Sequence, residues 1–306
     1  MSLDSGPAGD TASSPGSVRG GHRAAVPAWS YFAGSAVFHY LGPSFAVLLF
    51  ARVGPLGVAG LRIWSAALVF AVWRRPWRVL ERAGRRLLLA WGLVLAVMNA
   101  CFYLAIARLP LGTVAAIEFL PVIALAALGA RTARNLAALA AAVGGVYVLT
   151  DVRLSGQPLG FLFAFANAAL FAGYIVIAHR AAWRFPSGID GLAAAMLVAA
   201  ACVLPLGAWQ AGPAFADPVA LGAGIGVGIS SSVIPYVCDQ LAMARMTRAT
   251  YALLVALLPA TATVIGLLVL RQVPSPADAA GVALVITGVA LHRERRRPSG
   301  GGDSPP

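Results

Sequence analysis

Long runs of apolar residues, separated by short gaps that carry arginine, dominate the pattern along the chain. A helix needs about 20 predominantly apolar residues to cross the hydrocarbon core of a membrane. Ten runs are of this order. The predicted spans are 28–50, 56–73, 87–107, 111–130, 134–151, 159–179, 190–210, 219–242, 249–270 and 276–292. The pattern therefore predicts an all-α membrane protein with ten transmembrane helices.

The two ends of the chain differ from these runs. Residues 1–27 consist mainly of Gly, Ser, Pro and Ala and are expected to form a disordered cytoplasmic segment. The basic tail 293–306 is expected to be disordered in the same way. The apolar run after residue 27 is too long for the core of a signal peptide, which predicts a retained first span.

The positions of the arginines orient the predicted helices. All 23 basic residues are arginine, and with both termini placed in the cytoplasm, 18 lie in cytoplasmic segments and four in external loops. Cytoplasmic loops of membrane proteins carry an excess of positive charge. The bias predicts an even number of spans with both ends inside, and it explains the net charge of +12 without nucleic-acid binding.

A repeated segment relates the two halves of the chain. YLAIARLPLGTVAAIEFLP at 103–121 matches QLAMARMTRATYALLVALLP at 240–259, with six identities at a spacing of 137 residues before the Leu-Pro pair that both segments share. This offset carries five spans, so the two copies cross the membrane in opposite directions. Inverted repeats are typical of secondary transporters, which bind substrate near the midplane between the halves. The predicted repeats are residues 28–151 and 159–292.

Three segments of the chain together resemble a known family. These are LFARVGPLGVAGLRI at 49–63, NACFYLAIARLPLGTVAAIEFLP at 99–121 and SSVIPYVCDQLAMARMTRATYALLVALLP at 231–259. They resemble the EamA-type branch of the drug/metabolite transporter superfamily, and most closely its threonine/homoserine exporter-like group. The chain departs from the usual family pattern before Pro121, where a glycine is missing, and before Pro259, where an acid is missing.

The resemblance implies two inverted five-helix halves around a central cavity and export of small metabolites, such as amino acids or amines, from the cytoplasm. It places the family's IEF motif at Ile117, Glu118 and Phe119. Its Pro-Tyr-x-x-acid motif falls on Pro235, Tyr236 and Asp239, which makes Tyr236 and Asp239 site candidates. It also implies location in a bacterial cytoplasmic membrane.

Two acids, Glu118 and Asp239, lie inside apolar runs. An ionisable group within a span costs about 2.5–3.5 kcal/mol on insertion scales and usually faces a cavity or a partner. Glu118 lies near mid-depth, where it could bind a substrate ammonium or carry a proton; a structural hydrogen bond to a neighbouring helix is the alternative. Asp239 lies near the cytoplasmic end of its span, either at a cavity mouth or paired with Arg245 or Arg248.

Other polar residues inside the spans are secondary candidates. His39 could relay protons or bond a neighbouring helix, and Tyr40 is expected to point elsewhere. Arg62 is expected to snorkel or to bond helix-end carbonyls, with a direct substrate role as the alternative.

Further polar pairs could either line a pocket or join helices. These are Asn99 with Tyr103, and Asn167 with Tyr174. Ser232 is expected to share a polar, small-residue stripe with Gly228, Tyr236 and Asp239. The small-residue pairs Gly222/Gly226 and Gly224/Gly228 predict close helix packing rather than a nucleotide loop.

The sequence thus predicts a secondary transporter that exports a small molecule by alternating access, coupled to protons or by facilitated diffusion. It contains no cofactor motif, no metal-ligand cluster and no catalytic motif, and its expected partners are the substrate, protons and membrane lipid. An intramembrane enzyme, or a scaffold or lipid-handling protein, is the alternative. The sequence does not specify an oligomeric state.

Overall fold

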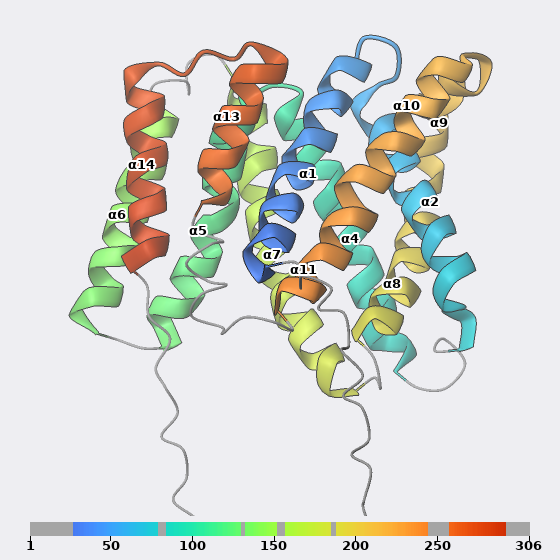
Figure 1. Cartoon of the computed structure of the whole chain (residues 1–306), viewed down its shortest axis with the longest axis horizontal. Helices are drawn as coiled ribbons and strands as arrows, with labels where there is room; N and C mark the ends of the chain where they lie inside the picture. The colour runs from blue at the N-terminus through green and yellow to red at the C-terminus, as the bar shows by residue number, and fades with distance from the viewer. Residues whose placement is uncertain are drawn as a thin grey trace, which may run out of the picture.

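The fold, seen in a computed structural model of the chain, is built from helices alone in the part that the structure describes (Figure 1). That part comprises residues 27–78, 84–129, 132–151, 157–184, 188–243 and 257–291. The first half contains α1 (Ala28–Leu49), α2 (Pro55–Arg74), α4 (Arg85–Ile106), α5 (Leu111–Gly129) and α6 (Ala133–Asp151). The second half contains α7 (Pro158–Arg184), α8 (Gly188–Cys202), α9 (Leu204–Ala216), α10 (Pro218–Gly228), the π-helical segment η1 (Ile229–Val233), α11 (Ile234–Met243), α13 (Leu258–Leu270) and α14 (Pro276–Leu291).

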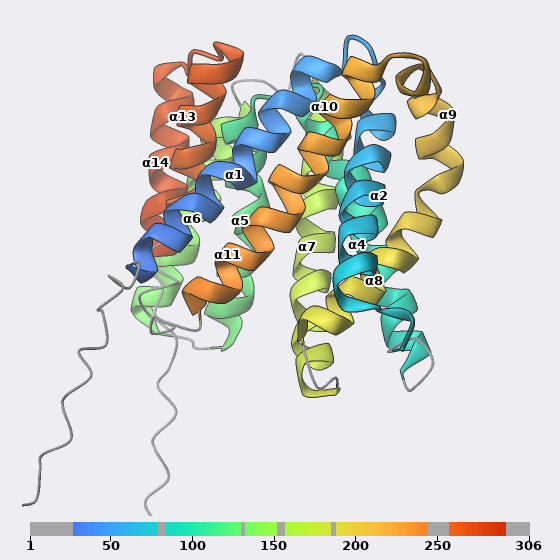
Figure 2. The ribbon, with the colours of Figure 1, turned by 45° about the vertical axis from the view of Figure 1, so that its right-hand side comes forward.

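The helices are those of a multi-pass membrane protein. Five of them are long and apolar enough to cross a membrane by length and composition: α1, α2, α4, α7 and the continuous pair α8–α9. Five shorter apolar helices accompany them among the described residues. Helix α1 begins and α14 ends at the same end of the bundle (Figures 1 and 2). We call this end the terminal side and the opposite end the distal side.

The predicted boundaries differ from the observed helices in four places. The sixth span was expected to end at 179, but α7 continues to Arg184. The seventh span was expected to end at 210, but α9 continues to Ala216 with Pro213 inside it. The eighth span is interrupted by the π-helical segment η1. Of the predicted ninth span, only α13 lies within the described residues, and the predicted tails 1–27 and 293–306 fall outside them except for Pro27.

Helix starts on the distal side are defined by proline and by capping side chains. Proline is favoured in the first turn of a helix, where its missing N–H has no intrahelical partner anyway, and it begins α2, α7, α10 and α14. At α14, Ser275 and Asp278 form a reciprocal cap: the Ser275 N–H donates to Asp278 Oδ2, and the Asp278 N–H donates to Ser275 Oγ. These short-range signals explain why the helix starts follow from the sequence.

Side chains of the second half also bind the distal helix starts of the first half. The N–H of Leu56 in α2 donates to Gln210 Oε1 at 3.0 Å, and the N–H of Leu111 in α5 donates to Gln272 Oε1 at 3.1 Å. Arg52 and Asp217 form an ion pair between the α1–α2 turn and the start of α10. The two halves are therefore joined by polar contacts at the distal side.

Asp217 also caps α10 by accepting hydrogen bonds from the N–H groups of Val219 and Ala220. The Ala220 hydrogen bond, supported by Arg52 and Val219, lowers the pKa of the Asp217 carboxyl. A lowered folded pKa stabilises the protein above the ordinary Asp pKa, and this stabilisation is lost as the pH falls through the lower folded value. We expect Asp217→Asn to reduce thermal stability at pH 7 and to lose this difference in strong acid, which melting scans at several pH values would measure.

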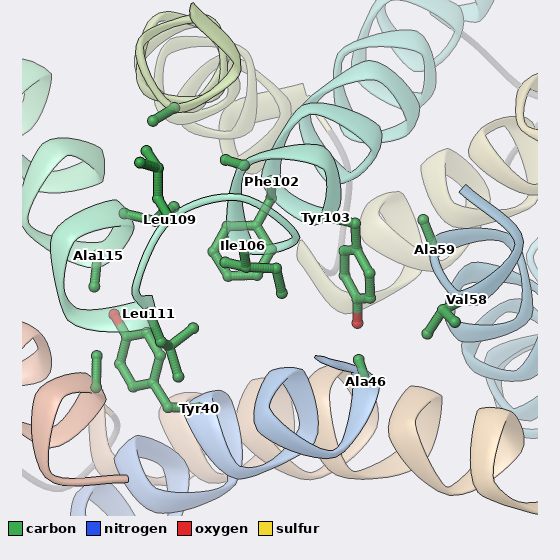
Figure 3. Packing of buried hydrophobic residues seen from close by; sticks show 14 of the residues in the cluster. Tyr40, Ala46, Val58, Ala59, Phe102, Tyr103, Ile106, Leu109, Leu111 and Ala115 are labelled. Carbon is green, nitrogen blue, oxygen red and sulfur yellow. The ribbon is translucent and has the colours of Figure 1, made fainter. Parts of the chain in front are cut away.

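Three groups of buried apolar residues form the interior. The largest includes residues of α1, α2, α4, α5, α6, α7, α9, α10, α13 and α14, and part of it is drawn in Figure 3. A second group joins α2, α4, α7 and α8, and a small third group joins α1 and α11. The large core spans both halves of the chain, whereas the two smaller groups are separate among the described residues.

Candidate functional site

Glu118 is held inside the bundle by an asparagine of the other half. It occupies the eighth position of α5, about 10 Å along the helix from Leu111 at 1.5 Å per residue. Its side chain is only 9% exposed, and its Oε1 accepts a hydrogen bond of 3.1 Å from Asn167 Nδ2 of α7. Asn167 is fully buried and its own oxygen has no partner. The structure therefore joins two candidate residues that lie 49 positions apart in the sequence.

Arg62 lies seven residues into α2, the same position that Glu118 has in α5. It is 8% exposed, so it does not snorkel, and the expectation of a helix-end position is wrong. Its Nε donates to Ser232 Oγ at 3.0 Å and its Nη2 donates to the Ser231 carbonyl oxygen at 3.1 Å, both in the middle of a span. The guanidinium also lies 5.6 Å from the centre of the Tyr103 ring, a cation–π distance.

The π-helical segment η1 explains why Ser231 and Ser232 can both accept hydrogen bonds from Arg62. A π turn replaces the i→i−4 ladder locally, and such turns occur frequently at functional sites. Here Ile234 donates to the Ile229 carbonyl, five residues back. Gly42 of α1 leaves room for Ser231, since a Cβ there would overlap the serine hydroxyl. Sequence reasoning missed the π turn; the run of three serines after Gly228 was its only visible signal.

Two buried tyrosine hydroxyls lie near these charged residues. Tyr40 points from α1 toward α5, and Tyr103 points from α4 toward α1 (Figure 3). Both side chains are fully buried; the Tyr40 hydroxyl has no hydrogen-bond partner among the described residues, whereas Tyr103 interacts with Arg62 and Ser231. Tyr40 interacts electrostatically with Glu118. The expectation that Tyr40 points away from the interior is therefore wrong; the adjacent His39 is half-buried.

The remaining candidate residues lie in different surroundings. Asn99 is buried, but its amide donates to the Leu95 carbonyl of its own helix. Tyr174 stacks on Phe171 at 6.1 Å and lies beside Trp91, whose buried indole N–H has no partner. Helix α11 contains Tyr236 and Asp239, but their side chains lie outside the described residues.

The glycines of α10 differ in what surrounds them. A Cβ on Gly228 would lie 2.7 Å from the Arg62 carbonyl oxygen, and one on Gly224 would lie 2.6 Å from Leu61 Cδ1. These two glycines pack α10 against α2. Gly222 and Gly226 are exposed, and a Cβ on either would meet nothing within 4 Å. These two glycines therefore pack against no other helix in the part of the chain that the structure describes.

The arrangement combines two buried opposite charges that do not pair directly. Among the described residues, neither Glu118 nor Arg62 makes an ion pair within 4 Å, although the Arg62 charge acts electrostatically on both Glu118 and His39. Burying an unpaired charge costs several kcal/mol. Such a site can bind a polar solute that supplies the missing charged and hydrogen-bonding partners.

Comparisons with known proteins agree with this architecture. Residues 158–293 match the EamA-like transporter family. The threonine/homoserine exporter RhtA of Escherichia coli K12 is 32% identical over 252 residues, covering 80% of this chain and 84% of that protein. RhtA of Salmonella typhimurium SL1344 is 34% identical over 239 residues, covering 76% and 79%.

The fold has a counterpart among solved structures as well. A crystal structure that is 20% identical superposes with a TM-score of 0.56 over 86% of this chain and 97% of the other. This likeness supports the fold alone, whereas the family assignment rests on the sequence relatives. On the strength of those relatives, the chain belongs to the EamA-like transporter family, which makes it a multi-pass membrane transporter and not an enzyme.

Proposed function

We propose that this protein exports a small amino acid across a bacterial cytoplasmic membrane, with Glu118 as the binding site for the substrate ammonium. The relatives that cover most of the chain are named threonine/homoserine exporters. The observation that carries the proposal is the buried Glu118 carboxylate, whose one hydrogen bond among the described residues comes from the neutral Asn167 amide. A substrate ammonium would supply the missing positive partner.

The environment of Glu118 suits a small polar solute better than a metal ion. The described residues contain no group of three His, Cys, Asp or Glu side chains that could hold a metal. The unpartnered oxygens of Tyr40 and Asn167 instead offer hydrogen bonds to polar substrate groups. Because buried polar groups are normally hydrogen-bonded, these atoms indicate a binding region that substrate or water completes.

Transport in this proposal proceeds by alternating access between two inverted halves whose termini are cytoplasmic. The continuous core and the distal hydrogen bonds from Gln210 and Gln272 support a structure closed on the distal side. Opening that side requires these contacts to break. On the terminal side, Arg74 and Asp190 form an ion pair of 2.7 Å between α2 and α8, which would tighten or break as the halves move.

Proton coupling would follow if Glu118 binds a proton and the substrate ammonium in turn. A carboxylate that cannot hold both at once exchanges one for the other, and inward proton flow could then drive export. Facilitated diffusion through the same site is the competing mechanism. A membrane scaffold or lipid-handling protein is disfavoured, because it has no need for opposite charges buried at mid-depth.

The proposal predicts substrate movement by the purified protein in liposomes. We expect uptake of labelled threonine or homoserine above that of protein-free liposomes. Uptake should be faster when the liposome interior is more acidic than the outside, because protons then flow outward as substrate enters. A panel of small cations lacking a carboxylate serves as the comparison. Transport that ignores the gradient would favour a facilitator; no movement of any amino acid would contradict the proposed function while leaving the family unaffected.

A further inference from the structure

The Arg62 guanidinium is a buried positive charge that lies beside the Tyr103 ring and donates its hydrogen bonds to neutral acceptors. Its two hydrogen bonds go to a hydroxyl and a backbone carbonyl of η1. The other described arginines that bind acids, Arg52 and Arg74, each have an aspartate within 3.0 Å. Arg62 has no such carboxylate among the described residues, although a guanidinium is shaped to bind one with two parallel hydrogen bonds.

The partners of Arg62 are suited to be displaced. A hydrogen bond between two charged groups is roughly twice as strong as one between neutral groups. A substrate carboxylate would therefore compete well against the Ser232 hydroxyl and the Ser231 carbonyl. Ser231 already uses its own hydroxyl to donate to the Val227 carbonyl, so the π-helical segment keeps internal hydrogen bonds when the guanidinium leaves.

Arg62 and Glu118 occupy equivalent positions along α2 and α5. Each lies seven residues from a helix start on the distal side, about 10 Å at 1.5 Å per residue. The two charges interact electrostatically without forming an ion pair within 4 Å among the described residues. Two opposite charges held apart in this way match a solute that carries both signs.

We propose that Arg62 is the carboxylate subsite of the substrate site, and that Ser231 and Ser232 hold its guanidinium in place until a substrate carboxylate replaces them. The inference rests on the proposed function, in which Glu118 binds the ammonium. It restricts the substrate class to compounds with a free ammonium and a free carboxylate. Amines and amino-acid amides, which lack the carboxylate, bind Glu118 alone.

The first test compares threonine with threoninamide, which has the same side chain and ammonium but no carboxylate. For the wild-type protein in liposomes, we expect the KM of threoninamide to exceed that of threonine by about 10- to 150-fold, the factor that a charged hydrogen bond contributes. In Arg62→Gln this ratio should fall to about threefold or less. A ratio that stays high in Arg62→Gln would overturn the inference.

A second variant keeps the inference testable if Arg62→Gln does not fold. Ser232→Ala leaves Arg62 in place and removes one neutral competitor of the substrate. We expect the KM for threonine to fall by about 2- to 10-fold, the factor of one ordinary hydrogen bond, with the KM for threoninamide unchanged. A purely structural Arg62–Ser232 bond would instead leave the KM unchanged or raise it, and either result would contradict the subsite.

Ser44→Ala is the matched control, because Ser44 is also buried but its hydroxyl donates to the Tyr40 carbonyl of its own helix. It should not change the ratio of the two KM values. Failure of this inference is distinguishable from failure of the proposed function. If the wild type moves no amino acid, the function is wrong; if it moves threonine and threoninamide equally well, the export function stands and the carboxylate subsite is wrong.

Discussion

Replacing Glu118 with glutamine should reduce threonine transport in liposomes by roughly 30-fold or more. Glutamine has the same size and can still accept a hydrogen bond from Asn167, so the packing of α5 against α7 is retained. It cannot balance the charge of a buried ammonium. Removing one partner of a buried charge pair costs about 2–5 kcal/mol, which corresponds to the expected loss.

The stability of Glu118→Gln separates a functional acid from a structural one. A buried carboxylate within a span costs about 2.5–3.5 kcal/mol, so its neutral replacement should melt at the same temperature as the wild type or higher. Asp190→Asn is the comparison for a structural acid in the melting measurement, because it breaks the ion pair with Arg74 and should lower the melting temperature. A Glu118→Gln protein that transports normally, or that melts well below the wild type, would show that Glu118 is structural.

The same variant reports on coupling. If Glu118 exchanges protons with substrate, the residual transport of Glu118→Gln should no longer respond to a pH gradient that accelerates the wild type. A residual rate that keeps the full gradient response would place the coupling group elsewhere, with His39 the next residue to replace.

Alanine at Gly228 should strongly reduce the yield and melting temperature of folded protein. A Cβ there would overlap the Ser65 hydroxyl and lie 2.7 Å from the Arg62 carbonyl oxygen, and a backbone atom cannot move aside cheaply. Overpacking of this kind typically costs about 1–3 kcal/mol. It would also push α10 away from Arg62, so the transport rate per folded molecule should fall as well.

Gly226→Ala is the matched control on the same helix. Its Cβ would meet nothing within 4 Å, and alanine favours a helix interior by about 0.5–1 kcal/mol over glycine. We expect Gly226→Ala to be as stable as the wild type or slightly more so. Melting of the two purified variants in one detergent tests the difference. Equal behaviour of Gly226→Ala and Gly228→Ala would mean that the close contact between α10 and α2 is absent in the membrane.

Much of the fold could be predicted from the sequence, because span location depends on short-range chemistry. Runs of apolar residues fix which segments become helices in lipid, where each backbone N–H and C=O must be satisfied internally. Proline at the start of α2, α7, α10 and α14 marks the turns without reference to the rest of the chain. The end of α9 at Ala216 differs from the prediction, because α9 continues through Pro213, a residue that usually marks a helix boundary.

The candidate site was only partly predictable. Glu118 and Asn167 were identified individually as polar residues in apolar runs, and the structure joins them by a hydrogen bond. The environment of Arg62 could not be predicted, because its acceptors lie about 170 residues away along the chain. The orientation of Tyr40 was also missed, because the packing of α1 against other helices decides which of two adjacent residues faces the interior.

The sequence by itself determined the class of protein, the number and limits of most helices, and the acid at mid-depth, because hydropathy and local turn signals act over a few residues. Only the tertiary structure decided that Arg62 is buried beside a π turn, that Gly228 but not Gly226 packs against α2, and that Glu118 meets Asn167. The physical reason is that these contacts join helices far apart in the chain, where packing and the need to satisfy buried polar groups outweigh local preference.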